Sequence, residues 1–457
     1  MRWTIVLTDS SDYSIDGYDR LITLNHDARC YGDPLSEYVL KNNEKLGNTL
    51  SQGLKRLSSL TNEHDLKTVS SILKIDGEIC FWHLSGASER CVVRNPLLED
   101  YYIYISVLEY IGEQKVGSIS IIGGSTLIAN QLLKRFPEST FLHNGKKLNS
   151  KYLSKSTFST VDASKKYLAA LFAFIKLFYS LLVTKKYSVS EMQNEGDLSF
   201  ICYSDNISVD QKGRFESTYF RDVSKKLYDS RKKVFWYHLF DSSRGLSPNA
   251  IVNQLRVQEK SDDFQVLRLL DGYSSLANFF TVITLYLQLQ KSGRKVEKIF
   301  DLKDQEKTSP WPFISDSWRR SISGGSSVKL INQIVLLKHL VKNSITDKPC
   351  FFLCEGMVWE RALLYFWRKY KNAPIYGCIH SSIKSLDFRL NFYGIDDARY
   401  RPDLFLYPLN TNTKRLSGFG LPASDIKKMA PMSDQKFMTR QNFQVTNRSE
   451  KLIGVVL

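Results

Sequence analysis

The chain has 457 residues, of which 43% are hydrophobic and 24% are charged. This length allows two or three domains, and this apolar content excludes an intrinsically disordered protein. The formal net charge of +16, from 63 basic and 47 acidic residues, favours an anionic partner such as a membrane surface, a nucleotide-sugar, an acidic glycan or a nucleic acid.

The first part of the chain predicts an N-terminal α/β domain over residues 1–160. Strands are predicted at residues 5–7, 79–84 and 118–122, and helices at residues 97–111 and 127–136. Gly123 and Gly124 stand between the last strand and the last helix, and we expect Ser125 or Thr126 to cap that helix. Phosphate binding by the free N–H groups of this turn is the alternative. The start of the chain is too short and too soon polar to be a signal peptide.

Residues 161–187 form an apolar segment flanked by lysine pairs, with Lys176 near its middle. A membrane-spanning helix needs roughly 20 apolar residues, so we expect this shorter segment not to span. A helix in the headgroup region of an anionic membrane fits better, with four side chains in the acyl boundary. These are Leu171, Phe174, Phe178 and Leu182. A buried helix that joins two domains is the alternative.

A second α/β domain is predicted over residues 195–430. Strands at 198–203 and 233–238 end at polar groups, which are Asp205, Asn206 and His238. The segment 215–227 is predicted to open the helix between these two strands. Residues 266–290 are predicted to form one or two long helices packed against a sheet, and residues 328–341 a further helix.

Residues 349–410 carry the clearest pattern of the chain. A strand at 350–354 stops at Glu355, and Gly356 then opens a helix over the following residues. A second strand at 375–379 ends at His380 and Ser381, and a third occupies 404–407. Strands that alternate with a helix of this length pair in parallel, because a parallel neighbour requires a crossover. Open sheets of this kind bind ligands at the carboxyl ends of their strands.

These blocks resemble a known family. The runs Glu355-Gly356-Met357-Val358-Trp359-Glu360, Tyr376-Gly377-Cys378-Ile379-His380-Ser381 and Pro402-Asp403 are similar to motifs of bacterial surface-carbohydrate biosynthesis proteins, and so are 203–206, 215–220 and 236–238. That family is similar to the GT-B type glycosyltransferases of O-antigen, lipopolysaccharide and capsule assembly. The resemblance covers residues 195–425 and implies two Rossmann-like parallel-sheet domains.

The resemblance implies transfer of a sugar from a nucleotide-sugar donor to a lipid-linked or growing glycan acceptor. We expect Glu355 to be the base and His380 to act as acid/base or ligand contact. Ser381, Glu360, Asp205, Asn206 and His238 are the further candidate ligand contacts. We expect Trp359 in the core and Asp403 in a structural role. A carboxylate solvated at a turn remains the alternative for Glu355.

Residues 431–457 are predicted to be a polar linker and the first strand of a further domain. The nucleotide-binding domain of the family resembled is carboxyl-terminal, so we expect a truncated chain that lacks part of its donor site. This raises a second hypothesis, a non-catalytic protein that binds a glycan or a partner enzyme of the same pathway.

Several function classes lack their motifs in this sequence. A nucleophile elbow, a P-loop and a His-Glu-x-x-His motif do not occur, which disfavours hydrolases, nucleotide triphosphatases and metalloproteases. We expect no metal and no other cofactor. Basic residues are not interleaved with aromatic residues, so nucleic acid is not the expected partner. The seven scattered cysteines indicate reduced thiols and, with the apolar segment at 161–187, a cytoplasmic protein at the inner face of the membrane.

Overall fold

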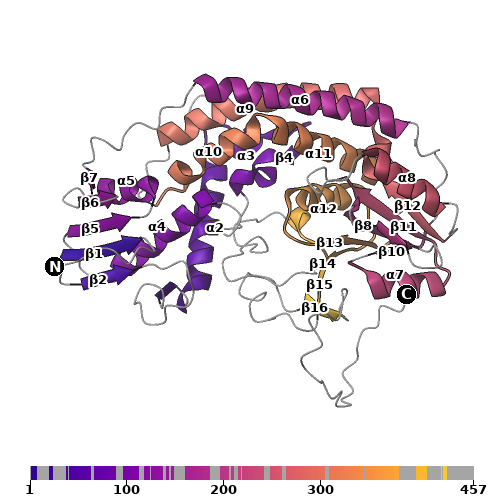
Figure 1. Cartoon of the computed structure of the whole chain (residues 1–457), viewed down its shortest axis with the longest axis horizontal. Coiled ribbons are helices and arrows are strands. Elements are labelled where there is room, and N and C mark those ends of the chain that lie inside the picture. Colours follow the sequence, from indigo (N-terminus) through magenta and orange to yellow (C-terminus); the bar gives the residue numbers. More distant parts are fainter. Residues whose placement is uncertain are drawn as a thin grey trace, which may run out of the picture.

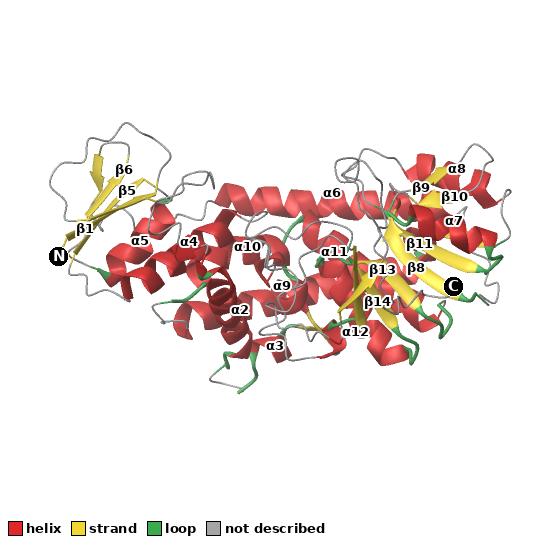
Figure 2. Cartoon of the chain, turned by 90° about the horizontal axis from the view of Figure 1, so that it is seen from below, coloured by secondary structure: helices red, strands yellow, loops and turns green. Residues whose placement is uncertain are grey.

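The structure is a computed structural model. It describes residues 2–7, 20–23, 38–39, 41–62, 66–88, 96–112, 118–123, 125–136, 140–143, 146–148, 160–185, 196–204, 207–209, 215–217, 219–240, 248–259, 264–303, 308–343, 345–379, 398–408, 424 and 426–429. In these parts, a small sheet and a large sheet lie at opposite ends of a layer of helices (Figures 1 and 2). The predicted linker and strand at 431–457 lie outside the described residues.

The small sheet has five strands. In spatial order they are β2 (Arg20–Thr23), β1 (Arg2–Leu7), β5 (Ser118–Gly123), β6 (Thr140–His143) and β7 (Lys146–Leu148). The first four pair in parallel and β7 pairs antiparallel to β6. Helix α5 (Thr126–Arg135) follows β5, and the Ser125 hydroxyl accepts a hydrogen bond from the Ile128 N–H at 3.2 Å. The predicted cap of this helix is therefore confirmed.

The middle layer is mainly helical. Its longer helices are α2 (Asn43–Ser59), α4 (Pro96–Gly112), α6 (Thr160–Lys185), α9 (Leu276–Lys303), α10 (Trp311–Ile322) and α11 (Gly325–Asn343). Aromatic rings pack between them, with the Trp82 ring 5.6 Å from those of Phe300 and Trp318. One continuous hydrophobic core includes this layer and the large sheet.

Residues 69–88 depart from the prediction of a strand over 79–84. After α3 (Val69–Ile72), strands β3 (Lys74–Ile75) and β4 (Ile79–Cys80) form a short antiparallel pair, and 3-10 helices follow at Phe81–Leu84 and Gly86–Ser88. The chain leaves the extended conformation because Phe81 and Trp82 turn into the aromatic core. Periodicity over a few residues cannot anticipate this tertiary packing.

The same segment contacts the large sheet's helices. The guanidinium of Arg361 donates to the His83 carbonyl at 2.6 Å, although Arg361 is only 6% exposed. Lys338 pairs with Asp76 and with Glu78, and Lys369 pairs with Glu78 at 2.8 Å. Residues 76–83 are thereby fixed to α11 and α12 (Val358–Tyr370).

The large sheet has seven strands, all paired in parallel. In spatial order they are β12 (Gln265–Leu269), β11 (Val234–Leu239), β8 (Leu198–Tyr203), β13 (Cys350–Leu353), β14 (Ile375–Cys378), β15 (Leu404–Pro408) and β16 (Ile426–Met429). The remaining elements are α7 (Arg221–Asp229), α8 (Pro248–Glu259), the antiparallel pair β9 (Ile207–Val209) and β10 (Phe215–Ser217), and the 3-10 helix η8 (Ala398–Tyr400). The predicted mixed α/β fold with a parallel sheet is confirmed, and this seven-stranded sheet is compatible with a Rossmann-like fold.

The predicted helix over residues 266–290 is wrong at its beginning. Gln265–Leu269 is strand β12, and its residues alternate between buried and half-buried as in an edge strand. A 3-10 helix, η7 (Leu270–Tyr273), separates it from α9. Apolar residues run through both elements, which explains why the sequence alone predicts helix from residue 266 onward.

Helices α6 and α9 lie side by side and antiparallel along one side of the molecule (Figure 1). The Phe178 and Phe279 rings are 5.5 Å apart, and the Tyr167 hydroxyl accepts a hydrogen bond from Arg294 at 2.6 Å. Helix α6 also packs on the start of α11, where a Cβ on Gly325 would lie 3.0 Å from the Ala169 carbonyl oxygen. Glycine thus permits this close approach of two backbones.

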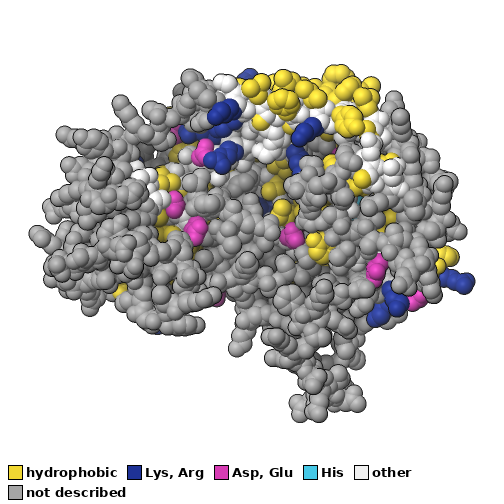
Figure 3. All heavy atoms as spheres, viewed as in Figure 1, with side chains coloured by type: hydrophobic (Ala, Val, Ile, Leu, Met, Phe, Trp, Pro, Cys, Tyr) yellow, Lys and Arg dark blue, Asp and Glu magenta, His cyan; other side chains and the backbone are white. Residues whose placement is uncertain are grey.

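The outward side of α6 and α9 is apolar, and we call it the apolar face. It consists of large side chains that are 41–63% exposed: Leu168, Leu171, Phe172, Ile175, Phe178, Leu182, Leu276, Phe280 and Leu287. Figure 3 shows these hydrophobic side chains gathered along one edge, bordered by lysine and arginine. Among the described residues, the 21 residues Ser164–Thr184 form the one helix that is long and apolar enough to cross a membrane, judged by length and composition alone. The expectation that this segment is too short to span is therefore wrong.

Phe174 differs from its predicted position on the lipid side. Its ring lies between the helices, 6.3 Å from Phe279 and 5.4 Å from Tyr286. Leu171, Phe178 and Leu182 are exposed as predicted. Helix α6 therefore has two apolar sides, one packed on the protein and one facing outward.

Candidate functional site

The order of strands in the large sheet creates a switch point between β8 and β13. The chain runs from β8 outward to β11 and β12, and then crosses back to build β13, β14, β15 and β16 on the other side of β8. Ligands of open α/β sheets bind at the carboxyl ends of the strands at such a point. Glu355 lies two residues beyond β13 at this edge and is half-buried.

Glu360 stabilises the turn that holds Glu355. Gly356 has a φ of +72°, and the Glu360 carboxylate accepts hydrogen bonds from the N–H groups of Glu355 and Gly356, both at 2.9 Å. Glu360 is 2% exposed, and burial raises the pKa of its carboxyl to about 8, although these N–H groups oppose the shift. Its oxygens therefore bind the loop that precedes its own helix.

Trp359 connects this turn to the neighbouring strand. Its indole N–H donates to the Tyr203 hydroxyl at 2.8 Å, and the two rings meet edge to face at 5.8 Å. Trp359 is 3% exposed, which confirms its predicted core position. Because Tyr203 ends β8 and Trp359 begins α12, this hydrogen bond holds both sides of the switch point together.

His238 lies inside the sheet and not in an open cleft at the strand end. It is the second-last residue of β11, is 0% exposed, and its Nδ1 is 3.3 Å from the Tyr203 carbonyl oxygen. Its Nε2 has no partner among the residues that the structure describes. Burial lowers its pKa to about 4, so the ring is neutral at pH 7.

The structure does not place the four remaining predicted site residues. His380, Ser381, Asp205 and Asn206 lie outside the described residues. Asp403 lies at the opposite, amino end of its strand, where its carboxylate accepts from Arg368 and from the Ile375 N–H, both at 2.8 Å. The structure thus agrees with the predicted structural role of Asp403.

A second part of the same edge contains a cavity of about 590 Å³. It lies where β11 and β12 end, and it is covered by α6 and by the first half of α11. Its wall is mainly apolar and includes Phe172, Leu177, Leu239, Phe240, Leu270 and Leu336. Cavities of this size and composition are typical small-molecule sites.

Polar groups from three elements line this cavity. Lys176 and Ser180 come from α6, Asp271 from η7, and Lys329 and Asn332 from α11. Burial raises the pKa of the Asp271 carboxyl to about 6, while its own N–H and the positive charge of Lys329 act in the opposite direction. The cavity therefore combines a mainly apolar lining with polar groups whose formal charges are net positive.

Sequence patterns do not reveal this cavity, although they contain one signal for it. Asp271 follows a strand almost directly, as Glu355 does, but the wrong helical prediction over 266–290 concealed the end of β12. The other lining groups lie about 60 to 100 residues away in sequence, on α6 and α11. Only the folded chain brings them together.

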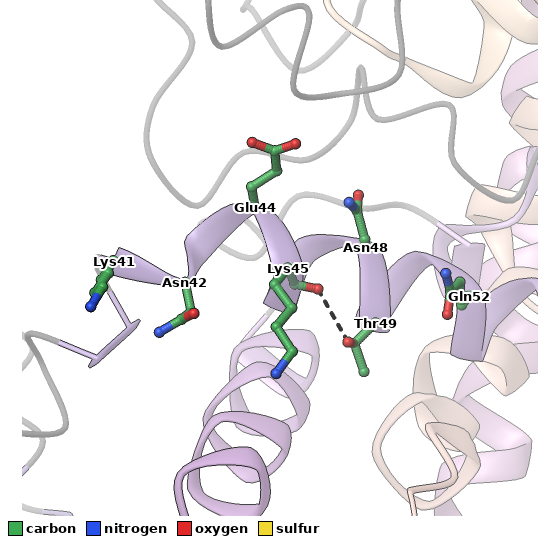
Figure 4. A pocket seen from close by; sticks show the side chains of 7 residues that line it. All are labelled: Lys41, Asn42, Glu44, Lys45, Asn48, Thr49 and Gln52. Carbon is green, nitrogen blue, oxygen red and sulfur yellow. Dashed lines mark hydrogen bonds between the residues drawn. The ribbon is translucent and has the colours of Figure 1, made fainter. Parts of the chain in front are cut away.

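A wide recess on α2 is a different kind of feature (Figure 4). It is lined by Lys41, Asn42, Glu44, Lys45, Asn48, Thr49 and Gln52. All seven come from one stretch of chain, and their side chains fan outward, apart from the Thr49 hydroxyl, which donates to the Lys45 carbonyl at 3.1 Å. A single exposed polar helix surface does not converge on a ligand, so we assign no site there.

Five cysteines lie in the described parts of the chain, at positions 80, 202, 350, 354 and 378, and all are free and buried. This confirms the predicted reduced thiols for these positions. Among the described residues, no group of three or more His, Cys, Asp or Glu side chains is arranged to hold a metal ion. No family model, curated protein or solved structure matches the chain.

Proposed function

We propose that this protein is a membrane-peripheral glycosyltransferase of bacterial surface polysaccharide synthesis. It transfers a sugar from a nucleotide-sugar to a lipid-linked or growing glycan. The observation that supports this best is the position of Glu355 at the switch point of the seven-stranded parallel sheet. In this proposal, the five-stranded and seven-stranded sheets correspond to two α/β units of the GT-B type.

Glu355 has the role of the base in this proposal. Sugar transfer requires a group that takes the proton of the acceptor hydroxyl as the new bond forms. The Glu360 carboxylate and the Gly356 turn hold the Glu355 backbone just beyond the end of β13. The Glu355 side chain therefore starts from a fixed backbone position at the sheet edge. In this proposal His380 and Ser381 contact the donor, together with Asp205 and Asn206, which come soon after β8 in the sequence.

The apolar face supports the membrane part of the proposal. Its nine large side chains come from two adjacent helices, and Lys165 and Lys176 on α6 and Lys291 and Lys295 on α9 are exposed beside it. Isolated exposed apolar side chains are common, but a contiguous patch of this kind indicates a binding surface. Apolar side chains bordered by lysines fit the boundary between anionic headgroups and acyl chains.

One observation favours a second candidate, a non-catalytic protein that binds a glycan or a partner of the same pathway. The backbone N–H groups of Glu355 and Gly356 precede α12, where a donor phosphate is stabilised in many α/β enzymes. Here the Glu360 carboxylate already accepts both of them. A donor phosphate then requires other groups, or displacement of Glu360.

The test is the Glu355→Gln variant, which keeps the size of the side chain and removes its charge and basicity. We expect nucleotide-sugar binding to remain within a few-fold of the wild type and transfer to a lipid-linked acceptor to fall at least 100-fold. Binding is measured by ligand-observed NMR and transfer by release of the nucleotide.

Glu44→Gln is the matched control, because Glu44 is exposed on α2 and remote from the sheet edge. It makes the same chemical change and is expected to leave transfer unchanged. Full transfer activity of Glu355→Gln would remove Glu355 from its assigned role. Absence of nucleotide-sugar binding by the wild-type protein would instead favour the non-catalytic candidate.

A further inference from the structure

The cavity beneath α6 opens on the apolar face. Phe172 is 62% exposed and Tyr179 is 53% exposed, yet both line the cavity. Lys176, between them on the same helix, also lines the cavity and is exposed. These three residues therefore belong to the mouth, while Leu239 and Leu270, which are 1% and 2% exposed, belong to its floor. The mouth faces the same side as the proposed membrane contact.

The lining offers both apolar and polar side chains. Phe172, Leu177 and Leu239 offer no hydrogen-bonding side chain and suit a hydrocarbon chain. Lys176 and Lys329 supply two positive charges against the single carboxylate of Asp271. Charged and amide donors of this kind fit a phosphate oxygen.

Ser180 gives an independent indication of a ligand. It is 9% exposed and lines the cavity, and its Oγ has no hydrogen-bond partner among the described residues. Buried hydroxyl groups are nearly always hydrogen-bonded, so an unpartnered one in a cavity wall requires an explanation. Asn332, also 9% exposed, lines the same cavity from α11.

We propose that this cavity binds a lipid phosphate, with its hydrocarbon chain along the apolar wall and its phosphate at Lys176, Lys329 and Ser180. The ligand enters from the membrane through the mouth between Phe172 and Tyr179. The proposal deepens the proposed function by naming the class of acceptor, and it rests on that function only for the reaction that follows binding. The cavity and the Glu355 turn lie at the same edge of one sheet.

The first experiment measures binding without any transfer. Farnesyl phosphate, palmitoyl lysophosphatidate, farnesol and inorganic phosphate are each titrated below their aggregation concentrations against the whole protein by calorimetry. We expect one equivalent of a lipid phosphate to bind, with farnesol and inorganic phosphate at least tenfold weaker. The two lipid phosphates distinguish an isoprenoid from an acyl source.

Charge variants then locate the phosphate. The double variant Lys176→Gln, Lys329→Gln is expected to bind farnesyl phosphate at least tenfold more weakly than the wild type. Its affinity for farnesol should be unchanged. Lys342→Gln is the matched control on α11, because Lys342 is exposed and outside the cavity lining. Asp271→Asn removes the opposing negative charge and is expected to increase the affinity for farnesyl phosphate several-fold. A misfolded variant would lose affinity, so this increase cannot result from misfolding.

A last comparison separates the cavity from the apolar face. Leu171 and Ile175 are on the face but do not line the cavity. Replacing both by serine is expected to leave farnesyl phosphate affinity unchanged. Equal loss of affinity in this variant and in the lysine variant, or equal binding of farnesol and farnesyl phosphate, overturns the proposal. Because no sugar donor is present, either result leaves the test of Glu355 unaffected.

Discussion

Burial shifts the pKa values of two residues near the switch point in opposite directions. Burial raises the pKa of Glu360 to about 8 and lowers that of His238 to about 4, because the charged form of each loses hydration. The His238 ring is therefore neutral at pH 7, and burial disfavours the ionised form of Glu360, which the N–H groups of Glu355 and Gly356 stabilise. Glu360 positions the backbone of Glu355. His238 is a core residue whose Nδ1 lies 3.3 Å from the Tyr203 carbonyl oxygen at the end of β8.

His238 makes the protein sensitive to acid. Its folded-state pKa of about 4 lies below the value of 6.5 for an unperturbed histidine, so between these values only the unfolded chain takes up the proton. Stability then falls as pH falls from 6.5 to 4, by up to about 1.4 kcal/mol per pH unit. We expect His238→Gln to lose this part of the pH dependence.

The measurement is the free energy of unfolding from urea titrations of both proteins at pH 7, 6 and 5. The difference between the two proteins isolates His238, since Glu360 and other carboxyl groups titrate in both. If the difference stays constant across these pH values, His238 is accessible to protons in the folded state and its buried position is refuted.

The elements show which parts of the fold the sequence predicts. Strands β8, β11, β13 and β14 were found because each is a short apolar run that ends at a polar residue. β12 and the 3-10 helix at Phe81–Leu84 were missed because tertiary packing decides their conformation. Glu355 was placed at a strand end from sequence alone, whereas the cavity needed three distant segments to be brought together.

The close crossing of α6 and α11 predicts that a larger residue at position 325 destabilises the protein. A Cβ on Gly325 would lie 3.0 Å from the Ala169 carbonyl oxygen and 3.4 Å from the Ala173 Cβ, so the two helices must separate to accept it. We expect Gly325→Ala to destabilise the protein by about 1 to 3 kcal/mol, the usual cost of overpacking. The readout is the midpoint of thermal unfolding.

Gly112, at the end of α4, provides the control, since a Cβ there meets no atom of the described residues within 4 Å. Gly112→Ala is expected to be neutral or slightly stabilising. A Gly325→Ala protein as stable as the wild type would mean that α6 is not fixed against α11 at this crossing.

For the whole molecule, the apolar face predicts binding to anionic vesicles. Leu171→Ser combined with Ile175→Ser removes two large side chains that are each 55% exposed. Burying such a side chain contributes about 1.5 to 3 kcal/mol, so we expect the double variant to bind vesicles of phosphatidylglycerol and phosphatidylcholine at least tenfold more weakly. Sedimentation with vesicles measures the bound fraction.

Leu66→Ser serves as the comparison, because Leu66 is 79% exposed but lies outside α6 and α9. It should bind vesicles like the wild type. Raising the salt concentration should weaken binding of all these proteins, because lysines contribute through screened charges. Equal vesicle binding by the double variant and the wild type would show that another surface makes the contact.

The contacts of residues 76–83 with α11 and α12 restrict the motions open to the protein. Two-lobed enzymes commonly close around a substrate by rotating about a hinge. Here the nearly buried Arg361 donates to the His83 carbonyl, and Lys369 pairs with Glu78, so a rotation of the helical layer against α12 and the seven-stranded sheet would break these contacts. It would also open the hydrophobic core that the layer and the sheet share, which makes a large hinge movement between them costly.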